Sequence, residues 1–379
     1  MIMRIAVISL GRSHLINLAR ELDKIDEVET FFYTMMPKSR CRKFGYFGKV
    51  VSCLFPIGIL SVLIEKIPFL NPYRRSYLRI RLRLFFDKWV SWQLKKCDVL
   101  IGLNGTAVRC SERAKKKFGA ITICDQGSSH ILTQDAARRS YTDNEPPQLN
   151  TDYMLKHYKV VDYLMSPAEY VKQSDIQNGI AKYKILYNPY GVNLDIFKPV
   201  DIEKEKEYDV IMVGSWWKHK GCDMLAEACI NRLGLRLLHV GSRIDCPFPD
   251  SHLFTHVDFV PESELPKYYA KAKVFAMPSL DEGFGLVLLQ AAACGLPIVG
   301  STRTGSPDVA KLLGNPRECF TIEEPLTVES VVKAIKKAIQ SANELHDGCG
   351  YASAKTLQNI SWGAYGKRYF EIISKVLNR

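Results

Sequence analysis

Residues Pro278–Val299 read PSLDEGFGLVLLQAAACGLPIV, and this stretch decides the fold. An apolar run ending at Met277 leads into a glycine-rich turn, then a helix-forming run, then a second apolar run. Strand, turn, helix and strand in that order are typical of a parallel βαβ unit. We expect the helix to start near Gly285 or Leu286, where its unpaired N–H groups and positive dipole end face the turn.

The residue types around this turn suit a sugar bound through a diphosphate. Gly283 and Gly285 let the backbone approach a ligand, and a helix start attracts an anion. A carboxylate at Glu282 fits beside an anion only if it accepts hydrogen bonds from neutral hydroxyls, as a sugar supplies. Gln290 lies about two turns further along, beside the helix, where a ribose would meet it. The alternative is a tight strand–helix turn with no ligand.

Two series of apolar, β-rich runs alternate with helical patterns, which indicates α/β architecture with parallel sheets. The first series comprises residues 5–10, 99–103, 120–124 and 163–166, and the second comprises residues 209–214, 235–240, 256–260, 273–277 and 297–300. Between them, turn residues 188–199 and the charged run 201–207 predict a domain boundary.

Length and cysteine usage agree with a two-domain intracellular protein. At 379 residues the chain exceeds what one hydrophobic core usually serves. Its eleven cysteines are scattered without a Cys-x-x-Cys pair, so we expect reduced, mostly buried thiols. The first strand begins almost at Met1 without a leader pattern, which predicts a cytoplasmic protein.

Residues 37–97 hold fourteen Lys or Arg against Glu65 and Asp87, which accounts for the whole net charge of +12. Aromatic residues are interleaved with these charges, a mixture that suits peripheral binding to an anionic membrane surface. The apolar run at residues 50–64 is shorter than the roughly 20 residues needed to span a bilayer. Two alternatives are an amphipathic helix over residues 74–96 with a solvated basic side, and a nucleic-acid surface. No nucleic-acid motif accompanies the charge, so we expect no nucleic-acid partner.

The stretch around Glu282 resembles the donor-binding signature of the retaining glycosyltransferase family 4, whose members have the GT-B fold: two facing Rossmann-like domains with parallel sheets and an interdomain cleft. Glu282 matches the first acid of that signature, which contacts donor-sugar hydroxyls. Gln290 replaces the second acid, which holds the ribose, and so loses a charge-assisted hydrogen bond. The resemblance implies an acceptor domain at residues 1–195, a donor domain at residues 196–364, and a last helix, residues 365–379, that crosses back onto the first domain.

Other stretches resemble the family in the same order along the chain. Lys220 fits a lysine that clamps the donor diphosphate, whereas Ser215 stands where the family has an arginine. Gly11 fits the glycine loop near the transfer site, and Val260 lies in a loop like the one that packs on the donor base. The pattern around His130 resembles a subgroup motif that places a histidine near the reacting carbon. The alternatives are a solvated lysine and a structural histidine.

The resemblance therefore implies a set of site residues. The implied catalytic residues are His130 and Glu282, and the implied donor-binding residues are Gly11, Ser215, Lys220, Val260, Gly283, Phe284, Gly285, Leu286 and Gln290. No metal and no cofactor is expected, with a UDP- or GDP-linked sugar as co-substrate.

The implied reaction is the metal-independent transfer of a hexose, with its configuration retained, to a hydroxyl of a glycan acceptor. The basic segment adds an expectation that the acceptor is lipid-linked, at the cytoplasmic face of the membrane, in cell-surface polysaccharide or glycolipid assembly. Two alternatives are a nucleotide-sugar 2-epimerase-like enzyme and a non-catalytic relative that binds a nucleotide sugar or another protein.

Overall fold

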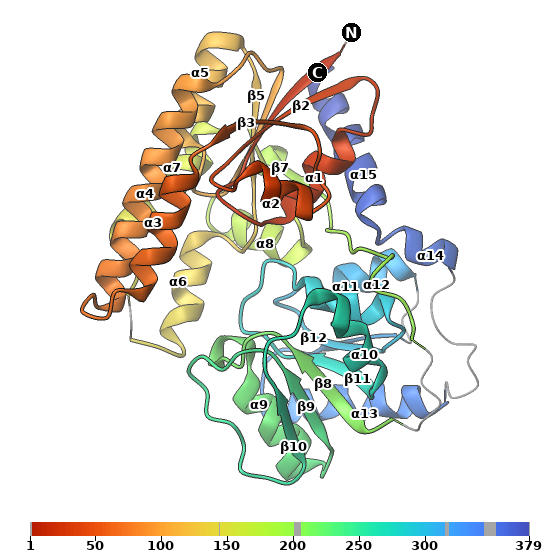
Figure 1. Cartoon of the computed structure of the whole chain (residues 1–379). Coiled ribbons are helices and arrows are strands. Elements are labelled where there is room, and N and C mark those ends of the chain that lie inside the picture. Colours follow the sequence, from red (N-terminus) through yellow and green to blue (C-terminus); the bar gives the residue numbers. More distant parts are fainter. Residues whose placement is uncertain (1, 144, 201–205, 315–317, 345–353, 379) are drawn as a thin grey trace.

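The computed structural model describes residues 2–143, 145–200, 206–314, 318–344 and 354–378. It contains two parallel sheets, each with helices on both faces, stacked one above the other in Figure 1. The α/β GT-B architecture predicted from the sequence is confirmed.

The first sheet has seven strands in the order β3-β2-β1-β4-β5-β6-β7, all parallel. Its strands are β1 (Met3–Ile8), β2 (Val28–Thr34), β3 (Lys49–Cys53), β4 (Val99–Leu103), β5 (Ile121–Asp125), β6 (Tyr163–Ser166) and β7 (Ile185–Tyr187). Its helices are α1 (His14–Leu22), α2 (Lys38–Lys43), α3 (Phe55–Lys66), α4 (Pro72–Gln93), α5 (Val108–Phe118), α6 (Ile131–Arg139), α7 (Gln148–Val160) and α8 (Glu169–Gln177).

The second sheet has six parallel strands in the order β10-β9-β8-β11-β12-β13. Its strands are β8 (Tyr208–Val213), β9 (Leu237–Val240), β10 (Phe254–Val257), β11 (Ala272–Met277), β12 (Ile298–Ser301) and β13 (Cys319–Ile322). Its helices are α9 (Cys222–Ala226), α10 (Leu265–Ala270), α11 (Leu286–Ala293), α12 (Ser306–Leu313) and α13 (Val328–Glu344).

In each sheet the order in which the chain adds strands reverses beside the first strand. This switch point lies between β1 and β4 in the first sheet and between β8 and β11 in the second. Open α/β sheets bind ligands outside the carboxyl ends of the strands at such a point. Here the carboxyl ends of the two sheets face each other. The loop after β5 touches the loop after β11, where Ser129 Oγ donates to Asp281 Oδ1 over 2.6 Å. The two candidate ligand-binding edges therefore meet between the domains.

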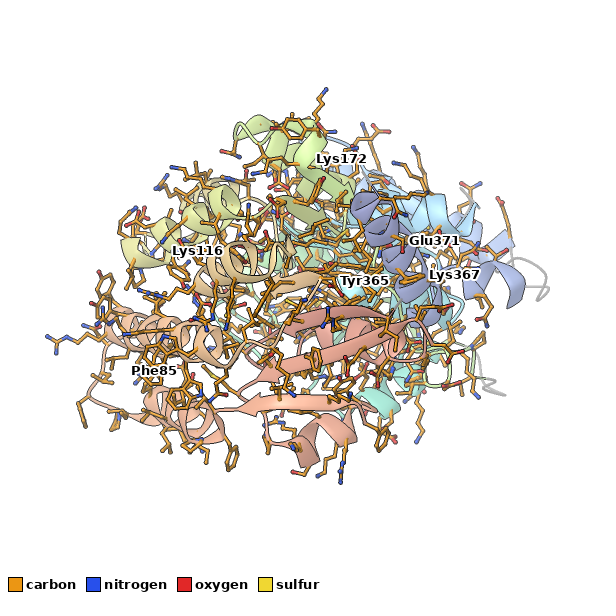
Figure 2. The ribbon with its side chains drawn as sticks, turned by 90° about the horizontal axis from the view of Figure 1, so that it is seen from above. Phe85, Lys116, Lys172, Tyr365, Lys367 and Glu371 are labelled. Carbon is orange, nitrogen blue, oxygen red and sulfur yellow. The ribbon has the colours of Figure 1, made fainter. Side chains whose placement is uncertain are left out.

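The chain ends with α14 (Ala354–Gln358) and α15 (Trp362–Leu377), and α15 packs against α1 of the first domain. The hydroxyl of Tyr369 donates to Asp125 Oδ2 over 2.9 Å. A Cβ on Gly366 would lie 2.4 Å from Cβ of Glu21, so a glycine is needed for this close approach. Figure 2 shows α15, with Tyr365, Lys367 and Glu371, on the opposite side of the first domain from Phe85 of α4.

The basic segment forms α2, β3, α3 and α4 at one edge of the first domain (Figure 1). Asn71 caps α4 by accepting from the backbone N–H of Arg74 over 2.8 Å, and Pro72 takes the first helical position. Phe86 and Val90 of α4 are fully buried in the core, whereas Phe85 and Trp92 are exposed. A helix considered for residues 74–96 is therefore present as α4, but it ends at Gln93, exposes aromatic as well as basic side chains and buries Asp87, so it lacks a separate apolar and basic side.

Candidate functional site

Lys220 and Glu282 meet at the switch point of the second sheet. The segment after β8 carries Lys220, the segment after β11 carries Glu282, and their side chains form an ion pair that is about one-fifth exposed. The carbonyl of His219 accepts from Leu280 N over 2.9 Å and from Ser279 Oγ over 3.1 Å, which holds the two segments together. Both residues were predicted from the sequence to bind one ligand, and in the fold their side chains are in direct contact.

Asp281, next to Glu282, joins the two domains. It is buried and accepts hydrogen bonds from Ser129 Oγ and from Tyr170 OH, at 2.6 and 2.8 Å, both from the first domain. A buried carboxylate needs such donors to offset its lost hydration. Nothing in the sequence pattern singled out Asp281, because its partners lie more than a hundred residues away.

At Gly283 the backbone of the second domain lies close to the backbone of the first. A Cβ at this position would lie 2.0 Å from the carbonyl oxygen of Gly127 and 2.8 Å from the backbone N of Ser128. The missing side chain therefore makes room for the other domain's loop. The sequence pattern had predicted a close approach of a ligand at this position.

Phe284 and Gly285 fix the conformation of the turn. The ring of Phe284 is buried and packs on Tyr190 of the interdomain segment at 5.5 Å, so its side chain is part of the core. Gly285 adopts φ +82, which favours glycine, and α11 begins at the next residue, Leu286, as predicted.

A cleft of about 670 Å³ lies between the domains beside this turn. From the second domain it is lined by Val260, Leu286 and Gln290 among others, and from the first by the loop and helix start Arg12–His14. Three of the predicted donor-binding residues thus face one space. The side-chain oxygen of Gln290 accepts a hydrogen bond from Tyr269 OH over 3.2 Å.

Arg12 reaches across this cleft, and no role was predicted for it from the sequence. Its guanidinium pairs with Glu262 of the second domain and lies over the ring of Phe44 at 4.8 Å. The signal available in the sequence was its position directly after Gly11, at the carboxyl end of the first strand.

Gly11, Ser215 and His130 lie apart from that cleft. Gly11 lines a larger cavity of about 760 Å³ within the first domain. Ser215 follows β8 and is half-buried. His130 is buried, packs on Tyr158 at 4.7 Å, and accepts from the N–H of Leu132 through Nδ1 over 3.3 Å. Burial lowers the pKa of His130 to about 4, so the ring is neutral at physiological pH.

A buried polar network beside His130 was not predicted. His14 Nε2 lies 2.6 Å from Asp125 Oδ1, the ring of Tyr190 stacks on His14 at 4.3 Å, and Tyr369 donates to the other oxygen of Asp125. The network joins the start of α1, the end of β5, the interdomain segment and α15. It fixes the first domain's edge of the cleft.

The described residues include no group of three or more His, Cys, Asp or Glu placed to hold a metal ion. The nine cysteines whose side chains the structure describes are all buried. No helix within the described ranges combines the length and apolar character that crossing a membrane would require.

Comparison with known sequences finds a family match within the second domain. Residues 207–341 match the family described as Glycosyl transferases group 1. O-antigen chain mannosyltransferase B of Escherichia coli is 35% identical over 109 residues, 28% of this chain and 26% of that protein. GDP-mannose-dependent alpha-(1-6)-phosphatidylinositol monomannoside mannosyltransferase of Mycolicibacterium smegmatis is 33% identical over 130 residues, 31% of this chain and 33% of that protein. The match thus spans a third or less of either relative.

Solved structures resemble the whole chain. Sucrose-phosphate synthase from Thermosynechococcus elongatus superposes with a TM-score of 0.67 at 15% identity, covering 99% of both chains. Anabaena HepE, solved in complex with UDP and glucose, superposes with a TM-score of 0.64 at 13% identity, covering 98% of this chain and 99% of HepE. The chain therefore has the GT-B fold throughout, and its residues 207–341 are similar to the glycosyl transferases group 1.

Proposed function

We propose that this protein is a retaining, metal-independent glycosyltransferase. It moves a hexose from a UDP- or GDP-linked sugar to a hydroxyl of a glycan acceptor. The observation that carries this proposal is the contact of Lys220 with Glu282 at the switch point, beside the start of α11. A lysine, a carboxylate and a helix start side by side suit a ligand that is anionic at one end and hydroxylated at the other.

The ion pair gives each charge a role in donor binding. A bound diphosphate attracts Lys220, and Glu282 is then released to accept hydrogen bonds from sugar hydroxyls. Negative charge grows on the diphosphate as the sugar departs, so Lys220 and the N–H groups at the start of α11 stabilise the transition state more than the ground state. The departing phosphate assists deprotonation of the acceptor hydroxyl, as implied by the family resemblance. His130, kept neutral by burial, hydrogen-bonds a sugar hydroxyl.

Support for a nucleotide sugar comes from the cleft and from the comparisons. Val260 and Gln290 both line the cleft beside α11, which supports binding of a base and a ribose there. HepE, which shares the fold, was solved with UDP and glucose, and one curated relative is GDP-mannose-dependent. Gly11 and Ser215 belong to the proposed donor site as well, at the ends of β1 and β8.

We further propose that the protein works at the cytoplasmic face of a membrane, on a lipid-linked glycan of cell-surface polysaccharide or glycolipid assembly. Support comes from residues 37–97, where exposed Phe47, Phe69 and Trp92 accompany the excess positive charge. Aromatic and basic side chains together bind anionic bilayer surfaces.

The test is donor-dependent transfer by single variants. Lys220→Ala and Glu282→Ala are each expected to lower the rate more than tenfold, because each removes one half of the donor contact. Lys267 and Glu264 form an exposed ion pair in the same domain, so Lys267→Ala and Glu264→Ala are matched controls and should keep near-normal rates. Near-normal transfer by both site variants would overturn the proposal.

The nucleotide and sugar can be identified by thermal stabilisation with a panel of UDP- and GDP-sugars. A ligand present at 100 times its Kd adds about 2.7 kcal/mol to the free energy of unfolding. The stabilising ligand should lose this effect with Lys220→Ala. Transfer of that sugar without interconversion of the free donor separates a transferase from an epimerase.

A further inference from the structure

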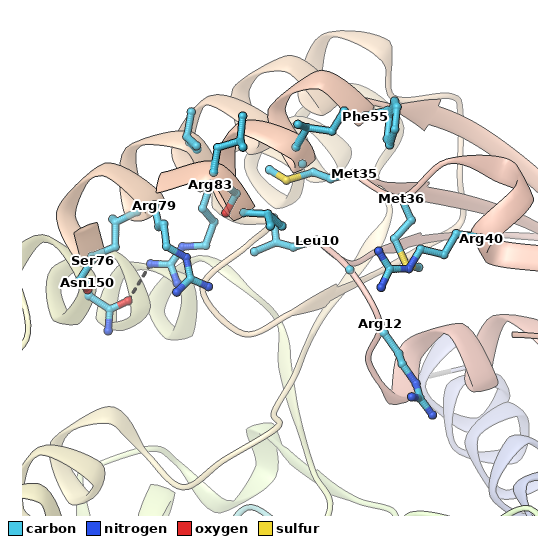
Figure 3. A pocket seen from close by; sticks show the side chains of 18 of the residues that line it. Leu10, Arg12, Met35, Met36, Arg40, Phe55, Ser76, Arg79, Arg83 and Asn150 are labelled. Atoms are coloured by element: carbon cyan, nitrogen blue, oxygen red, sulfur yellow. Dashed lines mark hydrogen bonds between the residues drawn. The ribbon is translucent and has the colours of Figure 1, made fainter. Parts of the chain in front are cut away.

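The larger cavity of the first domain, of about 760 Å³, is built from two unlike walls (Figure 3). One wall is α3, which contributes Phe55, Ile59 and Val62. The other wall carries arginines from three helices, α2, α4 and α6, and from the loop after β1, and the lining also includes Leu10, Met35 and Met36. The lining arginines are Arg12, Arg40, Arg79, Arg83 and Arg138. We call this space the arginine cavity.

Positive charge in the arginine cavity is only partly neutralised. Of the residues that line it, five are arginines and none is acidic. Carboxylates from outside pair with three of them: Glu262 with Arg12, Glu65 with Arg79, and Asp135 with Arg138. The remaining two, Arg40 and Arg83, form no direct ion pair with a carboxylate among the described residues, and Asp87 offsets only part of the charge on Arg83.

Arg83 has an N–H donor that is available to an anion. One of its terminal nitrogens donates to the side-chain oxygen of Asn150 over 2.7 Å, whereas its Nε is buried with no partner in the described structure. Burial lowers the pKa of Arg83, which reflects a guanidinium held in a poorly solvated place. Figure 3 shows Arg83 beside Arg79 and Asn150, with Arg40 reaching in from the far side next to Met36. Phosphate oxygens are the acceptors that such a fork of N–H donors fits best.

The α3 wall continues out of the cavity as an exposed apolar surface. Ile59, Val62 and Leu63 line the cavity and are still 43%, 59% and 50% exposed. The helix lies close to the domain at Gly58, where a Cβ would be 3.0 Å from the carbonyl oxygen of Met35. An apolar chain that entered along α3 would therefore stay in contact with hydrocarbon from the protein surface to the arginines.

We propose that the arginine cavity binds the phosphate-bearing headgroup of a membrane lipid, with the phosphate at Arg83, the hydrocarbon chain along α3, and Arg40 adding positive charge from the far side of the cavity. Two guanidinium groups without a direct ion pair leave the cavity positively charged, which favours an anionic headgroup. Arg12 lines both this cavity and the cleft between the domains, so a headgroup held here lies beside the proposed donor. The lipid is thus the acceptor or its carrier, an assignment that rests on the proposed function, whereas the binding itself does not.

The test is sedimentation with vesicles of phosphatidylcholine containing phosphatidic acid, compared with phosphatidylcholine alone, in the absence of any nucleotide sugar. The salt is set at about 0.5 M, where the attraction between exposed charges is largely screened. The double variant Arg40→Gln/Arg83→Gln is compared with Arg42→Gln/Arg81→Gln. The second pair is exposed, lies on the same helices two residues away, and changes the net charge equally.

We expect the full chain to bind the phosphatidic acid vesicles, the cavity variant to bind at least tenfold more weakly, and the surface variant to stay within about twofold. Equal losses in both double variants would mean a diffuse basic surface and would overturn the proposal. So would equal binding to both kinds of vesicle, or no binding. Arg40→Gln alone, at an exposed position, repeats the test where Arg83→Gln impairs folding.

Two further measurements separate the alternatives. Soluble glycerol 3-phosphate should compete only weakly, because it lacks the chain that contacts α3, and full competition would overturn the lipid assignment. Thermal stabilisation by nucleotide sugars should be the same in the cavity variant as in the unchanged chain. Lost lipid binding with intact donor stabilisation therefore tests the cavity without testing the proposed transfer.

Discussion

Replacing Gly283 with alanine is expected to force the two domains apart. The added Cβ would lie 2.0 Å from the carbonyl oxygen of Gly127, whereas ordinary contact begins at about 3.4 Å. The loops must therefore separate by about 1.4 Å, because the atom in the way is backbone and cannot rotate aside. The same movement stretches the contact from Ser129 to Asp281, now 2.6 Å, to about 4 Å, which is too long for a hydrogen bond.

The energetic effect follows from the bonds that hold the closed arrangement. Asp281 accepts two interdomain hydrogen bonds, from Ser129 and Tyr170, and a bond to a carboxylate contributes about 1.5–3 kcal/mol. Losing both destabilises closure by at least about 3 kcal/mol, which is roughly a hundredfold in the closed population. We expect kcat/KM for transfer to fall by a similar factor, since closure completes the proposed site.

The assay is small-angle X-ray scattering together with transfer kinetics. Gly283→Ala should increase the radius of gyration and reduce transfer. Gly127→Ala is the matched control on the opposite side of the same contact, since its Cβ would meet only a methyl of Leu103, at 4.0 Å. An unchanged scattering curve and rate for Gly283→Ala would refute the steric argument, as would equal effects of the two substitutions.

Three further predictions concern buried polar groups and the donor cleft. Tyr369→Phe removes a donor from Asp125 and should lower the free energy of unfolding by about 1–3 kcal/mol, measured in urea; an unchanged midpoint would contradict this. Burial lowers the pKa of His157 to about 3. Below pH 6.5 this histidine is therefore protonated in the unfolded chain but stays neutral in the folded chain. The free energy of unfolding consequently falls as the pH drops towards 3. His157→Asn, which keeps an acceptor for the N–H of Gly105, should flatten the dependence of unfolding free energy on pH in that window by about 1.4 kcal/mol per unit, and an identical slope would argue against the histidine. Gln290→Glu should tighten binding of the stabilising nucleotide sugar several-fold in calorimetry by supplying a charge-assisted hydrogen bond, and weaker binding would place the ribose elsewhere.

The central strands of both sheets were predictable because they are continuous apolar runs. The predicted runs at residues 99–103 and 163–166 coincide with β4 and β6, and the run at 273–277 with most of β11. Four strands were missed: β2, β3, β7 and β13. They lie towards or at the sheet edges, where one face or one side is less covered and polar residues such as Glu29 and Lys49 interrupt the apolar pattern.

Proximity of residues within one domain could be predicted from the sequence, whereas contacts with the other domain could not. Lys220 and Glu282 lie at the carboxyl ends of neighbouring strands, so their proximity follows from the βαβ pattern. Asp281 and Arg12 find their partners across the domain boundary, and no spacing in the sequence encodes those distances. The same limit applies to Gly283, whose neighbour comes from a loop 156 residues earlier.

The packing of α15 on α1 sets an order of events during synthesis. The chain crosses between the domains twice, and the two crossings are bonded together: Val192 donates from its N–H to the carbonyl of Ile360 over 2.7 Å. The apolar face of α1 and the carboxylate of Asp125 receive their final cover from a segment made only after the whole second domain has left the ribosome. The first domain therefore stays partly uncovered until α15 has been synthesised. Chaperone dependence and failure after truncation ahead of residue 362 are the consequences to expect in a cell.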